Sequence, residues 1–352
     1  MSSYNIYGGT PKKTLDLLKH FKGNSALYVY SNSYAEFKPL FEETGASTYE
    51  GNYGRNLFLH IQDLIKIIDN EKVDIVQTQF SMGEVLGYAL KILRPHIKVM
   101  VAFVGPFEPK GIKKIIVNGL YKKFDAFVFI SEYVKNAKCK QFPVLINKKS
   151  KIIFNGTEKR QPTNDDYTEM KHISLYSTSG LVDWKNIDVL VEALNILKKQ
   201  GMETVYLYVA GDGPERENLE KKIKKYNLEE QIFLLGYQKN IGALLDQADI
   251  YVHPAYAEGF GIAVAEAMMA GKLMIVSSAG ALPELVEDGK SGLVVDPFDA
   301  KAWAEAIKKL IDNEEFTSEL GQNAKKRAET EFSIEKYVSN YNDLYLSLME
   351  QK

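Results

Sequence analysis

Short apolar segments alternate with amphipathic ones along the chain, and this alternation limits the possible folds more than any other feature. The apolar segments are rich in Val, Ile, Leu, Phe and Tyr and are bounded by Gly, Pro, Asn, Asp or Ser. The expected strands are 26–30, 73–77, 99–103, 126–130, 151–154, 173–177, 205–210, 232–235, 250–253, 274–277 and 293–295. The expected helices between them include 57–70, 188–199, 215–225 and 300–312. Near-continuous apolar strands alternating with helices predict an α/β fold whose parallel sheets are covered on both faces.

The 352 residues suffice for two domains of this kind. A polar segment at 155–167 has neither helical nor strand periodicity and contains Gly156 and Pro162, which is typical of a linker. We therefore expect an N-terminal Rossmann-like domain over 1–160 and a second one over 161–330. Apolar residues at three- and four-residue spacing predict a final amphipathic helix over 333–349, within a C-terminal segment 331–352.

The charge differs between the two halves. Residues 1–160 carry 24 Lys and Arg against 14 Asp and Glu, a balance of +10, whereas residues 161–352 carry 20 against 32, a balance of −12. A basic half indicates an anionic partner or a solvated lysine-rich surface. The lysines of 110–123 alternate with Ile and Leu, which fits a peripheral contact with an anionic membrane, a polyprenyl-phosphate acceptor, or a plain surface helix. No nucleic-acid recognition motif accompanies the charge.

Several classes of site are excluded by composition. The single cysteine, Cys139, permits no intramolecular disulfide and no cysteine-based zinc site, and the five histidines lack metal-ligand spacing. The apolar runs are too short for a membrane span, and the first residues lack the apolar core of a signal peptide. We expect a cytoplasmic protein, with peripheral contact at the inner face of the membrane left open.

The segment 253–271 carries the clearest candidate site. An expected strand leads into Glu258-Gly259-Phe260-Gly261, and a helix is expected to begin at Ile262. The unpaired N–H groups of a helix N-terminus favour a phosphate, so those of Ile262 and Ala263 are candidates for a diphosphate. Glu266 lies on the same face four residues after Ile262 and could accept hydrogen bonds from ribose hydroxyls. The alternative is a helix whose acidic residue only favours the dipole.

A second candidate lies near the N-terminus. Thr10 is a good N-cap and Pro11 suits the first helical position, so Gly8 and Gly9 are expected to open a helix. Its N-terminus could contact a phosphate, or the segment could be a plain strand–helix turn.

The run EGFGIAVAEAMMAGKLMIVS from Glu258 resembles the signature of family 4 (group 1) glycosyltransferases. These are retaining enzymes that use nucleotide sugars and have the GT-B fold. Further similar segments are 8–21, 129–135, 209–219, 233–240 and 279–297. The resemblance implies two Rossmann-like domains with parallel sheets facing a central cleft, and a final helix that packs back on the first domain. It implies a UDP- or GDP-sugar donor, a glycan or lipid-linked acceptor, and a place in surface polysaccharide or glycoconjugate biosynthesis.

The resemblance also implies roles for individual residues. Glu258, with Gly259, Phe260 and Gly261, would hold the donor hexose, and Glu266 the ribose. Lys185 matches the lysine that neutralises the leaving diphosphate, although a lone lysine is usually solvated. The remaining nucleotide and diphosphate contacts would come from Gly8, Gly9, Gly211, Tyr237, Ile262 and Ala263; for Tyr237, ordinary packing is the alternative.

This chain departs from the family pattern at two positions. Gly180 stands where many members have an arginine, and Val104 where some have a histidine. The sequence contains no Asp-x-Asp pair, so we expect no metal and no other cofactor, and we name no general base. Two other functions remain open. One is a catalytically degenerate nucleotide-binding scaffold of the same fold. The other is a NAD-dependent oxidoreductase, although Gly211-Asp212-Gly213 offers only two of the three fingerprint glycines.

Overall fold

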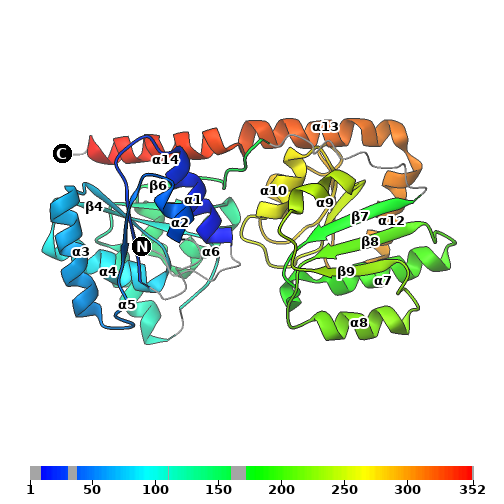
Figure 1. Cartoon of the computed structure of the whole chain (residues 1–352), viewed down its shortest axis with the longest axis horizontal. Coiled ribbons are helices and arrows are strands. Elements are labelled where there is room, and N and C mark those ends of the chain that lie inside the picture. The colour runs from blue at the N-terminus through cyan, green and yellow to red at the C-terminus, as the bar shows by residue number, and fades with distance from the viewer. Residues whose placement is uncertain (1–8, 31–37, 110, 160–171, 351–352) are drawn as a thin grey trace. The chain divides into compact units, whose positions relative to one another are not determined.

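The computed structural model describes residues 9–30, 38–109, 111–159 and 172–350. It divides into two compact units (Figure 1). The first unit comprises Met1–Gly156 and Ile334–Lys352, and the second unit comprises Thr157–Ser333. These divisions lie close to the limits of 160 and 330 expected from the sequence. Part of the expected linker, residues 160–167, falls outside the described residues.

The described part of the second unit contains one sheet of six strands in the order β12-β11-β10-β7-β8-β9. The strands are β7 (Ile173–Thr178), β8 (Val205–Ala210), β9 (Ile232–Gly236), β10 (Ile250–His253), β11 (Leu273–Ser277) and β12 (Leu293–Val295). All neighbouring pairs are parallel. This is the doubly wound order, in which the chain builds outward from β7 on one side and then from β10 on the other. The predicted α/β class with parallel sheets is confirmed.

Helices cover this sheet on both faces. The helical segments of this unit are η3 (Asp183–Lys185), α7 (Ile187–Lys199), α8 (Arg216–Lys225), α9 (Ile241–Gln247), α10 (Ile262–Met269), α11 (Leu282–Leu285), α12 (Ala300–Asp312) and α13 (Glu314–Glu331). Figure 1 shows α7 and α8 on one side of the strands and α9 and α10 on the other. The core between α7, α12 and the sheet is fully buried and includes Trp303. Burial of these aliphatic side chains provides the main stabilisation of the unit.

The described part of the first unit holds two parallel sheets, β1-β2 and β3-β4-β5-β6. The strands are β1 (Ala26–Val29), β2 (Ser47–Glu50), β3 (Ile75–Thr78), β4 (Lys98–Phe103), β5 (Ala126–Phe129) and β6 (Ser150–Ile152). The helical segments are α1 (Gly9–His20), α2 (Lys38–Glu42), α3 (Leu57–Glu71), α4 (Phe80–Leu93), α5 (Ile112–Tyr121), α6 (Glu132–Gln141), η2 (Pro143–Asn147) and α14 (Ile334–Met349).

The apolar face of α14 belongs to the core of the first unit. Tyr341, Leu344 and Leu348 are buried in one cluster with Met100 and Val128 of the central strands. The last helix of the chain therefore completes the unit that the N-terminal residues begin. No helix in the described ranges is long and apolar enough to cross a membrane.

Candidate active site

The site of interest lies where the doubly wound sheet reverses direction. β7 and β10 are neighbours, but the chain continues from β7 to β8 on one side and from β10 to β11 on the other. The loops that follow these two strands therefore diverge at their carboxyl ends. Ligands of such sheets bind in the crevice at this point. Lys185 follows β7 and Glu258 follows β10, so topology brings together two residues that are 73 positions apart.

The turn that carries Lys185 is fastened to the loop that carries Glu258. Lys185 ends the short helix η3, and Asn186 follows in the left-handed conformation with φ 56°. The Asn186 amide donates to the carbonyl of Pro297 at 2.6 Å and to that of Pro254 at 3.3 Å. The Tyr256 N–H donates to the carbonyl of Trp184 at 3.0 Å. These bonds fix the backbone of Lys185 relative to the loop after β10.

The backbone of Glu258 is fixed from its other side by the turn at Gly280. The N–H of Ala281 donates to the carbonyl of Glu258 at 3.0 Å. Gly280 has a φ of +63°, and a Cβ built there would lie 2.4 Å from that same carbonyl oxygen. Both the left-handed conformation and the close approach require glycine at this position.

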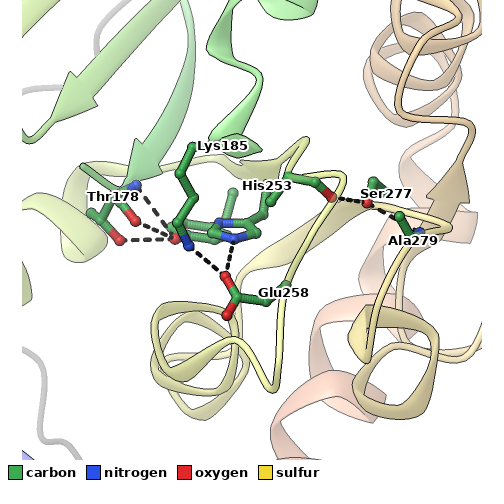
Figure 2. Close-up of polar contacts among 8 residues, drawn as sticks. Thr178, Lys185, His253, Glu258, Ser277 and Ala279 are labelled. Carbon is green, nitrogen blue, oxygen red and sulfur yellow. Dashed lines mark hydrogen bonds and ion pairs between the residues drawn. The ribbon is translucent and has the colours of Figure 1, made fainter. Parts of the chain in front are cut away.

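The Glu258 carboxylate receives two side-chain contacts on one oxygen (Figure 2). The Lys185 ammonium donates to Oε2 and forms an ion pair with it. The His253 Nε2 atom lies 3.3 Å from the same oxygen. Among the residues that the structure describes, no group contacts Oε1. The Lys185 and Glu258 side chains are 20% and 17% exposed, so solvent screens their attraction only weakly.

The surroundings fix the charges of these groups. Burial by itself raises the pKa of the Glu258 carboxyl, but the hydrogen bond from His253 and the charge of Lys185 outweigh it and hold that pKa well below its usual range. Burial lowers the pKa of His253, although its bond to Glu258 acts in the opposite direction. At neutral pH Glu258 is therefore a carboxylate beside a neutral imidazole.

No role was predicted for His253 from the sequence. Its side chain ends β10 and is only 1% exposed. Its ring lies nearly parallel to that of Tyr251, with centroids 6.2 Å apart, and the Tyr251 hydroxyl lies 2.8 Å from the hydroxyl of Thr178. The available signal was a histidine at the end of a buried strand, five residues before Glu258.

The helix N-terminus expected after Glu258 is present. α10 begins at Ile262, and its cap Gly261 has a φ of +100° and supplies no side-chain bond. The N–H groups of Ile262 and Ala263 therefore have no acceptor within the helix. Ile262, Ala263 and Glu266 are all partly exposed on one face of α10, as their spacing predicts.

Phe260 and Gly259 shape the loop before this helix. The Phe260 ring is 2% exposed and packs edge-to-face on Phe332, with centroids 5.7 Å apart. Its side chain thus anchors the loop in the core. Phe260 can therefore contact a ligand only through its backbone.

The remaining candidates in the second unit lie at the carboxyl ends of β8 and β9. Gly211 has a φ of +147°, and a Cβ there would lie 1.9 Å from the carbonyl oxygen of Ser179. The geometry assigns Gly211 a packing role, because it lets the loops after β7 and β8 touch. Tyr237 follows β9 and is 62% exposed. Gly180 lies in the loop after β7, and a Cβ there would meet only the carbonyl of Asp212, at 3.8 Å.

The N-terminal candidates belong to the first unit. Gly8 lies outside the described residues, and α1 begins at Gly9. Thr10 is therefore inside the first turn, so its expected role as N-cap is wrong. Val104 directly follows β4, at the carboxyl edge of its sheet. Whether Gly8 and Gly9 contact a donor phosphate stays a prediction.

Within the described ranges, no cluster of three or more His, Cys, Asp or Glu side chains has an arrangement that could hold a metal ion.

The comparisons with known proteins agree with this geometry. Residues 163–327 match the family described as Glycosyl transferases group 1. A glycosyltransferase of Methanocaldococcus jannaschii, MJ1178, is 26% identical over 327 residues, which cover 86% of this chain and 88% of that protein. A putative colanic acid biosynthesis glycosyltransferase of Salmonella typhimurium, WcaL, is 32% identical over 167 residues, 45% of this chain and 41% of that protein.

A solved structure is similar over the whole chain. The crystal structure of Anabaena HepE in complex with UDP superposes with a TM-score of 0.84 at 20% identity, and covers 99% of this chain and all of that one. At this identity the likeness establishes the fold. The second unit therefore carries a segment that matches the group 1 glycosyltransferases, and the chain has the GT-B fold of glycosyltransferases.

Proposed function

We propose that this chain transfers a hexose from a UDP- or GDP-sugar to a glycan or lipid-linked acceptor, with retention of the anomeric configuration and without a metal ion. The observation that carries the proposal is the ion pair of Lys185 and Glu258 at the switch point of the sheet, beside the N-terminus of α10. At this crevice a cation and a helix N-terminus suit the diphosphate of a nucleotide sugar, and a carboxylate suits its hexose.

In this proposal each group binds one part of the donor. The N–H groups of Ile262 and Ala263 hold the diphosphate, and Glu266 accepts hydrogen bonds from the ribose hydroxyls. The Lys185 ammonium moves from its ion pair with Glu258 toward the diphosphate, where it neutralises the charge that develops on the departing phosphate. Tyr237 lies against the base, and Gly8 and Gly9 contribute N–H groups from the first unit.

The chemical step exchanges one bond to the anomeric carbon for another. The bond from this carbon to the β-phosphate oxygen breaks, and a bond to the acceptor hydroxyl oxygen forms on the same face of the sugar. The acceptor proton passes to the departing phosphate oxygen, so no side chain acts as general base. Glu258 holds hydroxyls of the hexose during this exchange, and Lys185 stabilises the leaving group.

The known relatives guide the choice of donor and acceptor. The similar structure of HepE holds UDP, so UDP-sugars are the first donors to test. WcaL is described as acting in colanic acid biosynthesis, which favours a surface polysaccharide or glycoconjugate acceptor.

The basic first unit supports a peripheral contact with the inner face of the cell membrane. On α5, Ile115 and Ile116 are 74% and 53% exposed, and the exposed Lys122 and Lys123 follow the helix. Exposed isoleucines beside lysines suit an anionic lipid surface that also presents a polyprenyl-phosphate acceptor. Co-sedimentation with anionic vesicles tests this contact: the double variant Ile115→Ser, Ile116→Ser should remain in the supernatant, and equal sedimentation of both proteins would remove the proposal.

A thermal-shift panel of UDP, GDP, ADP, CDP and NAD, each with EDTA, tests the donor site. A ligand at 100 times its dissociation constant adds about 2.7 kcal/mol of stability, which a melting curve resolves. A shift with UDP or GDP supports the proposal and names the base. A shift with NAD alone would favour the oxidoreductase, and binding of UDP or GDP without any sugar turnover would favour the catalytically degenerate scaffold.

A further inference from the structure

The proton on the His253 ring can be placed from its contacts. An ionised carboxylate only accepts hydrogen bonds, so the 3.3 Å contact to Glu258 Oε2 requires a proton on Nε2 of His253. The neutral ring then has a lone pair on Nδ1. That atom is buried and has no hydrogen-bond partner among the described residues. The environment therefore selects the Nε2–H tautomer and disfavours a second proton.

This arrangement is costly for the fold. A buried nitrogen without a partner loses its bonds to water, and nothing in the described residues replaces them. A purely structural position at the end of β10 would be filled better by an apolar ring. The ring is also held rigidly, because it packs against Tyr251, whose hydroxyl meets Thr178. The hydrogen bond to Glu258 is the contact that offsets the cost of a histidine at this position.

The contact also explains the geometry of the carboxylate. Lys185 and His253 both bind Oε2, and two donors on one oxygen fix the rotation of the carboxylate plane (Figure 2). Oε1 is left without a contact among the described residues. With the carboxylate held in this orientation, Oε1 can accept a hydrogen bond from a ligand in a defined direction.

We propose that His253 is a positioning residue that holds Oε2 of Glu258 so that Oε1 accepts a hydrogen bond from a hydroxyl of the donor sugar. This inference rests on the proposed function. Lys185 cannot do this alone, because it is required at the leaving diphosphate, and its departure would free the carboxylate to rotate. A neutral, buried donor keeps the carboxylate in place without competing for the phosphate.

The same geometry excludes another role for this histidine. Nε2 carries the proton and faces Glu258, and Nδ1 is buried. Neither nitrogen offers a lone pair to an acceptor hydroxyl, so His253 is not the base of the transfer.

Two substitutions test the proposal. His253→Phe keeps a buried ring and removes the donor, whereas His253→Gln places an amide N–H near the position of Nε2. For the nucleotide sugar that the wild type uses, His253→Phe should raise the dissociation constant about tenfold or more, and His253→Gln should restore most of the affinity. Affinity for the free nucleoside diphosphate should change less than about twofold in both. His172→Phe is the matched control, because His172 also packs on an aromatic ring in the second unit, with centroids 4.6 Å apart.

Two results would overturn the proposal. In one, His253→Phe loses affinity for the free nucleotide and for the nucleotide sugar to the same extent; in the other, it loses affinity for neither. The ring tautomer gives a test that needs neither a ligand nor a folded variant. In wild-type protein at neutral pH, nitrogen NMR of His253 should show a protonated Nε2 and an unprotonated Nδ1. A proton on Nδ1 would refute the inference. Failure of the wild type to bind any nucleotide sugar would instead refute the proposed function. The tautomer measurement would then still test the hydrogen bond between His253 and Glu258.

Discussion

Replacing Gly280 by alanine should move Glu258 without touching its side chain. A Cβ at residue 280 would lie 2.4 Å from the Glu258 carbonyl oxygen, and real Cβ atoms essentially never come closer than 3.0 Å. The Glu258 backbone or the Gly280 turn must therefore shift by about 0.6 Å, the difference between these distances. Overpacking of this kind costs about 1–3 kcal/mol.

Gly289 provides a matched control in the same unit. Its φ is +69°, close to the +63° of Gly280, but a Cβ there meets nothing within 4 Å. The strain of a left-handed alanine is therefore common to Gly280→Ala and Gly289→Ala, about 1–2 kcal/mol in each. The difference between the two variants isolates the contact with Glu258.

Tryptophan fluorescence can follow unfolding of the second unit alone. The only two tryptophans of the sequence, Trp184 and Trp303, both lie in that unit. Urea unfolding should show Gly280→Ala to be about 1–3 kcal/mol less stable than Gly289→Ala. Under conditions where both are folded, Gly280→Ala should transfer sugar about 10- to 100-fold more slowly, because a displacement of about 1 Å at a reacting group has this effect. Equal stability and equal activity of the two variants would refute the reasoning.

Three further predictions concern the groups around Glu258. Glu266→Ala should weaken binding of UDP or GDP about tenfold, since it removes an acceptor for ribose hydroxyls, and unchanged nucleotide affinity in calorimetry would remove its assigned role. Lys185→Met should lower kcat about 10²- to 10³-fold with little change in donor KM, and steady-state kinetics that show only a KM effect would contradict its role at the leaving group. Acidification below pH 6.5 should destabilise the second unit by up to about 1.4 kcal/mol per pH unit. Burial lowers the pKa of His253, which faces Glu258 and Lys185, so the unfolded chain takes up a proton that the folded chain does not. The contribution of the neutral ring to stability is complete above pH 6.5 and decreases below it. In His253→Phe the free energy of unfolding should therefore depend less on pH in this range, and an unchanged pH dependence would argue against a neutral buried ring.

The strands of the second unit were predictable because their apolar runs are almost uninterrupted. The limits of β8, β10 and β12 agree with the sequence prediction. The strand β2, Ser47–Glu50, was missed, since its sequence STYE has no apolar run and its residues are at most half-buried. Periodicity detects burial on a face, and β2 has little of it.

The candidate site was only partly predictable. The family resemblance pointed to Glu258, Glu266 and Lys185 as candidates, and their roles stay predictions. It could not show that Lys185 and His253 share one carboxylate oxygen. That contact depends on the pairing of β7 with β10, which no local pattern reveals. The close approach of Gly280 to Glu258 is likewise a tertiary feature.

The most direct test of the account is calorimetric titration of the wild type and Glu258→Gln with UDP-sugars, GDP-sugars and the free diphosphates, all in EDTA. The account predicts that the wild type binds at least one nucleotide sugar more tightly than its free nucleotide, without metal. Glu258→Gln should keep the nucleotide affinity and lose the gain that the sugar provides. Absence of any binding to the wild type, or an equal gain from the sugar in both proteins, would contradict the assignment of Glu258 and Lys185 as a donor site.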